Sequence, residues 1–151
     1  MILNLSNLNI VNYYQSLIDN KINNEQYIPV AINFFIQKNI LQLEKYYNEI
    51  IHTRNIIIEH YQEMDEEGNQ IIPPDKIALA NKEIDELLAI VQKVDITLIP
   101  LKTFIDLNVQ LSTGQLSSLI FMIQEDTDIF TPLISYGKEE EQSILIDADK
   151  I

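Results

Sequence analysis

The feature that most constrains this 151-residue chain is an uninterrupted stretch of helix-forming sequence from residue 30 to residue 64. Neither proline nor glycine occurs between Val30 and Met64, and apolar side chains recur there at alternating steps of four and three residues. The members of this stripe are Ile36, Ile40, Leu43, Tyr47, Ile50, Arg54, Ile57, Tyr61 and Met64. This spacing is the a/d pattern of a coiled coil. A continuous helix of this length would measure on the order of 50 Å, so we expect part of it to project from a compact base.

A second helix is predicted after a break in the pattern at residues 65–74. Gly68 and Asn69 favour a turn, and the two prolines Pro73 and Pro74 prevent the first helix from continuing. Asp75 is then a suitable N-cap. The apolar stripe of this second helix consists of Ile77, Ala80, Ile84, Leu87 and Val91. Two matching stripes with a short link predict a long antiparallel helical hairpin over residues 30–93, sealed as a coiled coil.

The two ends of the chain are predicted to form a small base of short strands and helices. Helical spacing indicates a first helix over residues 7–19, and Pro29 suits the first turn of the long helix. Apolar and polar residues alternate over residues 94–99, which predicts a strand that pairs with residues 1–5. A helical turn is expected over 101–107, and Ser112 with Gln115 fits the capping box of a last helix.

The predicted fold class is therefore mostly α, with a minor α+β part. We expect a single helical-hairpin domain over residues 1–124 and an acidic C-terminal extension over 125–151. The extension holds eight acids and two lysines, and so contributes −6 to the net charge of −13. Its apolar stretches at 129–136 and 143–147 are compatible with weak strands, or with a tail that becomes ordered only on a partner.

The acidic balance and the residue types that are missing exclude several classes of function. A net charge of −13 with a single arginine disfavours direct contact with nucleic acid, whose affinity for proteins comes largely from Lys and Arg. It favours solubility and basic partners. The chain has no cysteine and only 3 glycines, and no apolar run approaches the length of a membrane span. We expect no cofactor, no metal and no contact with a membrane.

Candidate catalytic groups are sparse. Glu49 and His52 have the Glu-x-x-His spacing of di-metal helical sites, but such sites need a second copy, and the only other histidine is His60. Neither a Gly-x-Ser-x-Gly motif nor a phosphate-binding glycine pattern occurs. The sequence therefore predicts a protein that is not an enzyme.

Arg54 is the unusual member of the heptad stripe. A charge at a core position must be paired, and a single polar core residue can set register and oligomeric state. Alternatively, Arg54 lies near the edge of the hairpin and extends its guanidinium into solvent. The sequence leaves both interpretations open.

Four segments together resemble those of a group of small, uncharacterised bacteriophage proteins. The first ends a helix in an acidic turn, the second is the core of the next helix, the third is an alternating strand, and the fourth is a short terminal helix. These segments are Tyr61-Gln62-Glu63-Met64-Asp65-Glu66-Glu67-Gly68-Asn69, Asn81-Lys82-Glu83-Ile84-Asp85-Glu86-Leu87-Leu88, Val94-Asp95-Ile96-Thr97-Leu98 and Leu119-Ile120-Phe121-Met122-Ile123. The resemblance implies a phage or prophage origin and assigns no functional residues.

These features predict a phage-encoded, non-enzymatic interaction or assembly protein, expected to be an oligomeric virion or accessory component. Its partner would be a phage structural protein or a host protein, in the host cytoplasm or in the virion. The alternative is a host-directed anti-defence inhibitor that binds a host protein or a signalling nucleotide. The candidate contact residues are Arg54, Tyr47, Tyr61, Glu139, Glu140 and Glu141.

Overall fold

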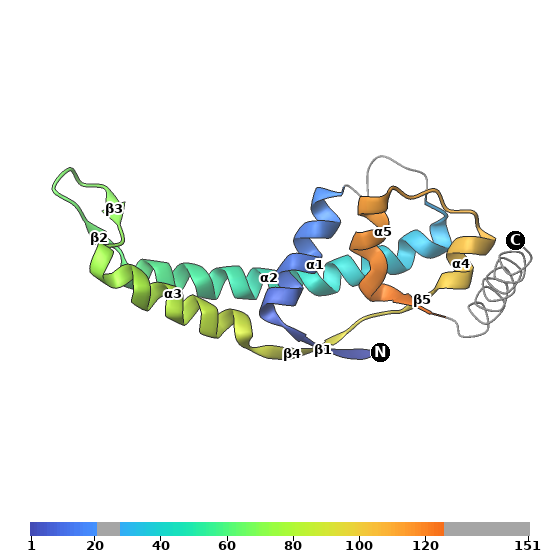
Figure 1. Ribbon diagram of the computed structural model, residues 1–151, viewed down its shortest axis with the longest axis horizontal. Coiled ribbons are helices and arrows are strands. Elements are labelled where there is room, and N and C mark those ends of the chain that lie inside the picture. Colours follow the sequence, from blue (N-terminus) through green and yellow to red (C-terminus); the bar gives the residue numbers. More distant parts are fainter. Residues whose placement is uncertain (21–27, 126–151) are drawn as a thin grey trace, which may run out of the picture.

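The computed structural model describes residues 1–20 and 28–125, and this part of the chain is mostly helical, as the sequence predicts. Its α-helices are α1 (Asn7–Asp19), α2 (Val30–Tyr61), α3 (Pro74–Ala89), α4 (Leu101–Asp106) and α5 (Thr113–Leu119), with a 3-10 turn at Ile120–Met122. Figure 1 shows an elongated molecule in which α2 follows the long axis. α1 crosses α2, while α4 and α5 lie at the base end of the molecule and α3 lies along the other end of α2.

Three pairs of short strands complete the described part of the fold. β1 (Ile2–Ser6) pairs antiparallel with β4 (Val91–Asp95), and Leu3 lies opposite Val94. β2 (Glu63–Met64) and β3 (Gln70–Ile71) form a small antiparallel ribbon between α2 and α3. β5 (Ile99–Pro100) pairs in parallel with β6 (Ile123–Gln124). The predicted pairing of the N-terminus with the strand after the second helix is therefore confirmed.

The predicted strand over residues 94–99 is nevertheless two separate strands. β4 ends at Asp95, and Ile96 makes the last contacts with the N-terminus: its N–H donates to the carbonyl of Met1 at 2.9 Å, and its carbonyl accepts from the N-terminal ammonium of Met1 at 2.9 Å. The backbone of Thr97 then makes its hydrogen bonds to a side chain instead of to a neighbouring strand. The Asn39 amide nitrogen donates to the Thr97 carbonyl at 2.8 Å, and the Asn39 oxygen accepts from the Thr97 N–H at 2.8 Å. This substitute for strand pairing lets the chain turn towards β6.

The hydrophobic core lies in the base. The part of α2 up to Ile50 contributes Ile32, Ile36, Ile40, Leu43 and Ile50, and all of these side chains are buried. They pack with Ile10 and Leu17 of α1, with Val94 and Ile96 of the β4 segment, and with Leu119 and Met122 near the end of the described chain. The core thus joins elements from both ends of the described sequence around this part of one helix.

The prediction of one coiled-coil seam along the whole stripe is wrong. Its members are buried only as far as Ile50, with Tyr47 half-buried, and Arg54 is exposed. Ile57 and Tyr61 are half-buried, and Met64 lies in β2 and is 73% exposed. In the second stripe, Val91 belongs to β4 rather than to the helix. The reason is that α2 packs against the base as far as Ile50, whereas beyond Ile50 the element that lies beside it is α3.

Helix ends differ slightly from the predicted ones, for identifiable reasons. α2 stops at Tyr61 because Gln62 adopts an extended backbone. Pro29 is the N-cap residue of α2 and does not lie in its first turn. Pro73, not Asp75, is the N-cap residue of α3, and Pro74 opens the helix, where its missing N–H costs nothing. The limits of α1 and the capping box at Ser112 agree with the prediction.

Asn7 fixes the direction in which α3 leaves the base. Its side chain is buried, and its amide nitrogen donates to the carbonyl of Leu87 at 2.8 Å. Its side-chain oxygen accepts from the Gln92 amide at 2.6 Å, and its own N–H bonds to the carbonyl of Ile90 at 2.8 Å. The start of α1 is therefore bound to the junction of α3 and β4, which holds α3 in place beside α2.

Candidate protein-contact surface

The part of the molecule that projects from the base, residues 51–89, is called the arm below. It consists of the last third of α2, the β2–β3 ribbon and α3 (Figure 1). Two hollows occur on it, one where the arm meets α1 and one at its far end. Because the core of the described structure lies in the base, the arm contributes surface more than it contributes core.

An apolar groove lies where α1, α2 and α3 meet. Its volume is about 400 Å³. It is lined by Leu8, Val11, Gln15, Tyr47, Ile50, Ile51, Arg54, Ile84, Leu87 and Leu88. The groove brings together two of the predicted contact residues, Tyr47 and Arg54. It also includes α1 residues that sequence reasoning missed, because nothing in the local pattern of α1 indicates that it crosses α2 at this point.

Arg54 lies at the groove with its side chain exposed. Within one chain Arg54 is therefore not a buried core residue but lies at the edge of the helix pair, with its side chain in solvent. Within residues 1–20 and 28–125 no carboxylate lies within ion-pair distance of its guanidinium. The residues three and four positions away on α2 are Ile50, Ile51, Ile57 and Ile58, so its own helix offers it no acidic neighbour.

Tyr47 is held in place by aromatic and polar contacts with α1. Its ring centroid lies 4.5 Å from that of Tyr14, and its hydroxyl accepts from the Gln15 amide at 3.4 Å. The hydroxyl of Tyr14 in turn donates to Glu44 at 3.3 Å. Partial burial, and then the nearby Glu44 carboxylate, raise the pKa of the Tyr14 hydroxyl. These contacts hold the Tyr47 side chain in a defined position at the end of the groove nearest the base.

Tyr61 joins the two helices of the arm near its far end. Its hydroxyl donates to the Glu83 carboxylate at 2.5 Å, and this hydrogen bond is the main reason that the pKa of Tyr61 is raised. Its ring also meets that of His60 edge-on, with the centroids 4.9 Å apart. The structure thus places Tyr61 in a contact between α2 and α3, away from the groove of Arg54 and Tyr47.

The far end of the arm, residues 62–73, is called the tip below. Its backbone forms a turn that is held by side-chain hydrogen bonds. The Asp65 carboxylate accepts from the N–H groups of Glu67 at 2.9 Å and Asn69 at 2.8 Å, and Gly68 adopts a positive φ of 84°. Glu63 pairs with Lys76 of α3. The carboxylates of Glu66 and Glu67, in contrast, lie on exposed side chains. The tip therefore presents two acidic side chains on a backbone that is already ordered.

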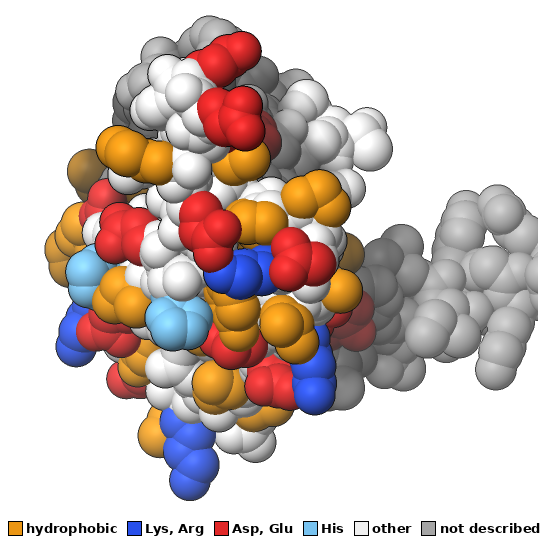
Figure 2. Space-filling model, turned by 90° about the vertical axis from the view of Figure 1, so that its left-hand side faces the viewer, with side chains coloured by type: hydrophobic (Ala, Val, Ile, Leu, Met, Phe, Trp, Pro, Cys, Tyr) orange, Lys and Arg blue, Asp and Glu red, His pale blue; other side chains and the backbone are white. Residues whose placement is uncertain are grey.

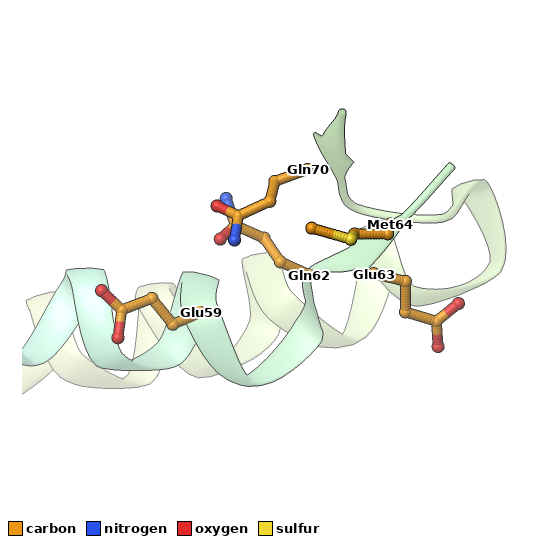
Figure 3. Close-up of a pocket in the computed structure, with 5 residues that line it drawn as sticks. All are labelled: Glu59, Gln62, Glu63, Met64 and Gln70. Carbon is orange, nitrogen blue, oxygen red and sulfur yellow. The ribbon is translucent and has the colours of Figure 1, made fainter. Parts of the chain in front are cut away.

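A shallow hollow of about 400 Å³ opens at the tip, lined by Glu59, Gln62, Glu63, Met64 and Gln70. Figure 3 shows the amide ends of Gln62 and Gln70 converging, with Met64 beside them and Glu63 turned away. Seen end-on, this side of the molecule carries acidic and apolar side chains side by side, with basic side chains among them (Figure 2).

Breaking the tip turn is expected to have a measurable local effect. Hydrogen bonds from the backbone of Asn69 and Glu67 lower the pKa of Asp65 below its usual value. A lowered folded-state pKa means that this carboxylate stabilises the tip above its ordinary pKa and ceases to do so as pH falls through the folded value. We expect the Asn69 amide to exchange faster with solvent in Asp65→Ala than in wild type at neutral pH. The difference should vanish in strong acid, and equal exchange at pH 7 would contradict the assignment.

The remaining predicted residues fall in two groups. Glu139, Glu140 and Glu141 lie outside the described residues. Glu49, His52 and His60, considered as metal ligands, are all exposed. Among the described residues, no three His, Cys, Asp or Glu side chains gather as a metal site would require. No helix in that part of the chain is both long enough and apolar enough to cross a membrane.

Comparison with known proteins identifies no relative. No protein-family model matches the chain, and neither the curated proteins nor the solved structures contain a significant match. The function must therefore be argued from the surface itself.

Proposed function

We propose that this chain is a non-enzymatic interaction and assembly protein that acts as an oligomer, with the arm as its contact element. The sequence resemblance to small phage proteins supports a role as a virion or accessory component of a phage. The proposal depends on α2 and α3 lying antiparallel to each other in the arm.

The observation that carries the proposal is the exposure of apolar side chains along the projecting arm. Met64 at the tip is 73% exposed, Ile56 on α2 is 51% exposed and Leu79 on α3 is 53% exposed. Exposed apolar residues also occur on the base, and the arm differs from it in projecting with an apolar groove at one end and a hollow at the other. A projecting element of this kind adds little to the stability of the base and is suited to contact another molecule.

The native mass of the purified full chain, measured by light scattering at low and high salt, tests the proposal. We expect a defined oligomer that persists at high salt, because apolar contacts are not screened by ions whereas exposed charge pairs are. A monomer under every condition would overturn the oligomeric role. It would favour the alternative of a host-directed inhibitor that binds a host protein or a signalling nucleotide.

A further inference from the structure

Arg54 and the acidic side chains of the tip are chemically complementary, and the face of α2 that carries Arg54 leads to the tip. Ile51, Arg54, Ile58 and Gln62 follow one another at steps of three and four residues, so they share a face of α2. This face begins at the apolar groove and ends at the tip hollow, which Gln62 lines. On α3, Ile77 lies seven positions before Ile84 of the groove and is 45% exposed. Ile51, Ile58 and Ile77 therefore provide apolar surface between the groove and the tip, and this surface is called the strip below.

The two ends of this strip carry opposite charges. At the groove, Arg54 is exposed and has no ion-pair partner within residues 1–20 and 28–125. At the tip, the Glu66 and Glu67 carboxylates are exposed, whereas Asp65 is occupied by the turn and Glu63 by Lys76. The tip points away from the base in Figure 1, so it does not reach the groove of its own chain.

We propose that a second copy of this chain binds antiparallel along this strip, so that Glu66 and Glu67 of each copy pair with Arg54 of the other. This inference rests on the proposed function, and it names the partner of the arm. Residues 54 and 62 are about 12 Å apart along the helix, and the acidic turn lies just beyond the helix end. A two-fold axis crossing the arm between them makes both charge contacts at once and closes the assembly as a dimer.

Net charge opposes the dimer and gives it an unusual response to salt. Two chains of −13 repel each other, and this long-range repulsion is screened well before contact between apolar side chains is affected. We therefore expect association to strengthen from very low salt to moderate salt. A pair held only by exposed ions would weaken over the same range.

Charge reversal in the full chain tests the arrangement. Light scattering over a concentration series should give a dimer for wild type. Both Arg54→Glu and the double variant Glu66→Lys/Glu67→Lys should shift the dimer towards monomer by at least tenfold in dissociation constant. The triple variant that combines all three changes should restore the dimer, because both contacts are then reversed together. Asp85→Lys/Glu86→Lys, which makes the same charge change on exposed residues of α3, is the matched control and should remain dimeric.

Glu66→Lys/Glu67→Lys is the most discriminating variant in this test. It removes negative charge from both copies, so general electrostatics predicts tighter association, whereas a specific pair with Arg54 predicts weaker association. Circular dichroism of each variant confirms that the helices are intact. A stable oligomer that is unaffected by Arg54→Glu, or a triple variant that is folded but not restored, would overturn the antiparallel dimer and leave the assembly role standing. A wild type that is monomeric throughout would overturn both.

Discussion

Replacing Asn39 with alanine is expected to destabilise the fold by about 2–4 kcal/mol, because the change leaves the N–H and carbonyl of Thr97 without their partners and opens a small cavity. The Asn39 side chain is buried, and both of its hydrogen bonds to Thr97 measure 2.8 Å. The amide also approaches the Met122 sulfur at 3.4 Å. One side chain therefore joins α2 to the segment between β4 and β5. Chemical denaturation of the purified variant measures the loss.

Two further variants separate this explanation from a general effect of mutating α2. Lys45→Ala on the same helix alters an exposed side chain and should change the free energy of unfolding by no more than about 0.5 kcal/mol. Asn39→Asp keeps the shape but loses the donor and introduces a buried charge, so it should destabilise at least as much as alanine at neutral pH. If Asn39→Ala were as mild as Lys45→Ala, the proposed substitute for strand pairing would be wrong.

Leu43→Ala is expected to cost about 3–4 kcal/mol in free energy of unfolding, and Ile57→Ala only about 1–2 kcal/mol, although both residues belong to one heptad stripe. Leu43 is fully buried in the base, whereas Ile57 is half-buried on the arm. Alanine keeps high helix propensity at both sites, so the comparison reports packing and not helix formation. Equal losses, measured by denaturation at the same protein concentration, would indicate that the stripe is one continuous seam.

This pair of variants also bears on function. If the arm is a contact surface, Ile57→Ala should leave the base folded while it changes the interaction of the arm. Leu43→Ala should lower the stability of the base and leave the surface of the arm intact. Measuring native mass beside stability therefore separates residues that hold the fold from residues that hold a partner.

Local sequence signals correctly predicted the helices and several of their limits. The period of α1, the capping box at Ser112, the turn at Gly68-Asn69 and the pairing of β1 with the strand after α3 all follow from spacing and turn chemistry. The helix period, the capping box and the turn depend on residues close in sequence. The strand pairing follows because the chain after α3 comes back to the N-terminus. The heptad stripe of α2 is a similar local signal, and it correctly indicated which face is buried up to Ile50.

The candidate site was only partly predictable. Tyr47, Arg54 and Tyr61 were selected from the stripe, and the structure brings Tyr47 and Arg54 together at the groove while it places Tyr61 against Glu83. The contribution of Leu8 and Val11 from α1 was missed, because the crossing of two helices leaves no mark in the local period of either. Gln62 and Gln70 were missed for a related reason, since they meet only after the β2–β3 ribbon has formed.

The sequence by itself determined the helical content, the positions of the turns and the sign of the net charge. Only the tertiary structure decided that one apolar stripe serves two purposes, as core up to Ile50 and as arm surface beyond it. It alone decided that Asn39, on the buried face of α2, is satisfied by the backbone of Thr97. The physical reason is that periodicity reports which side of a helix is apolar, whereas burial depends on what another part of the chain places against that side.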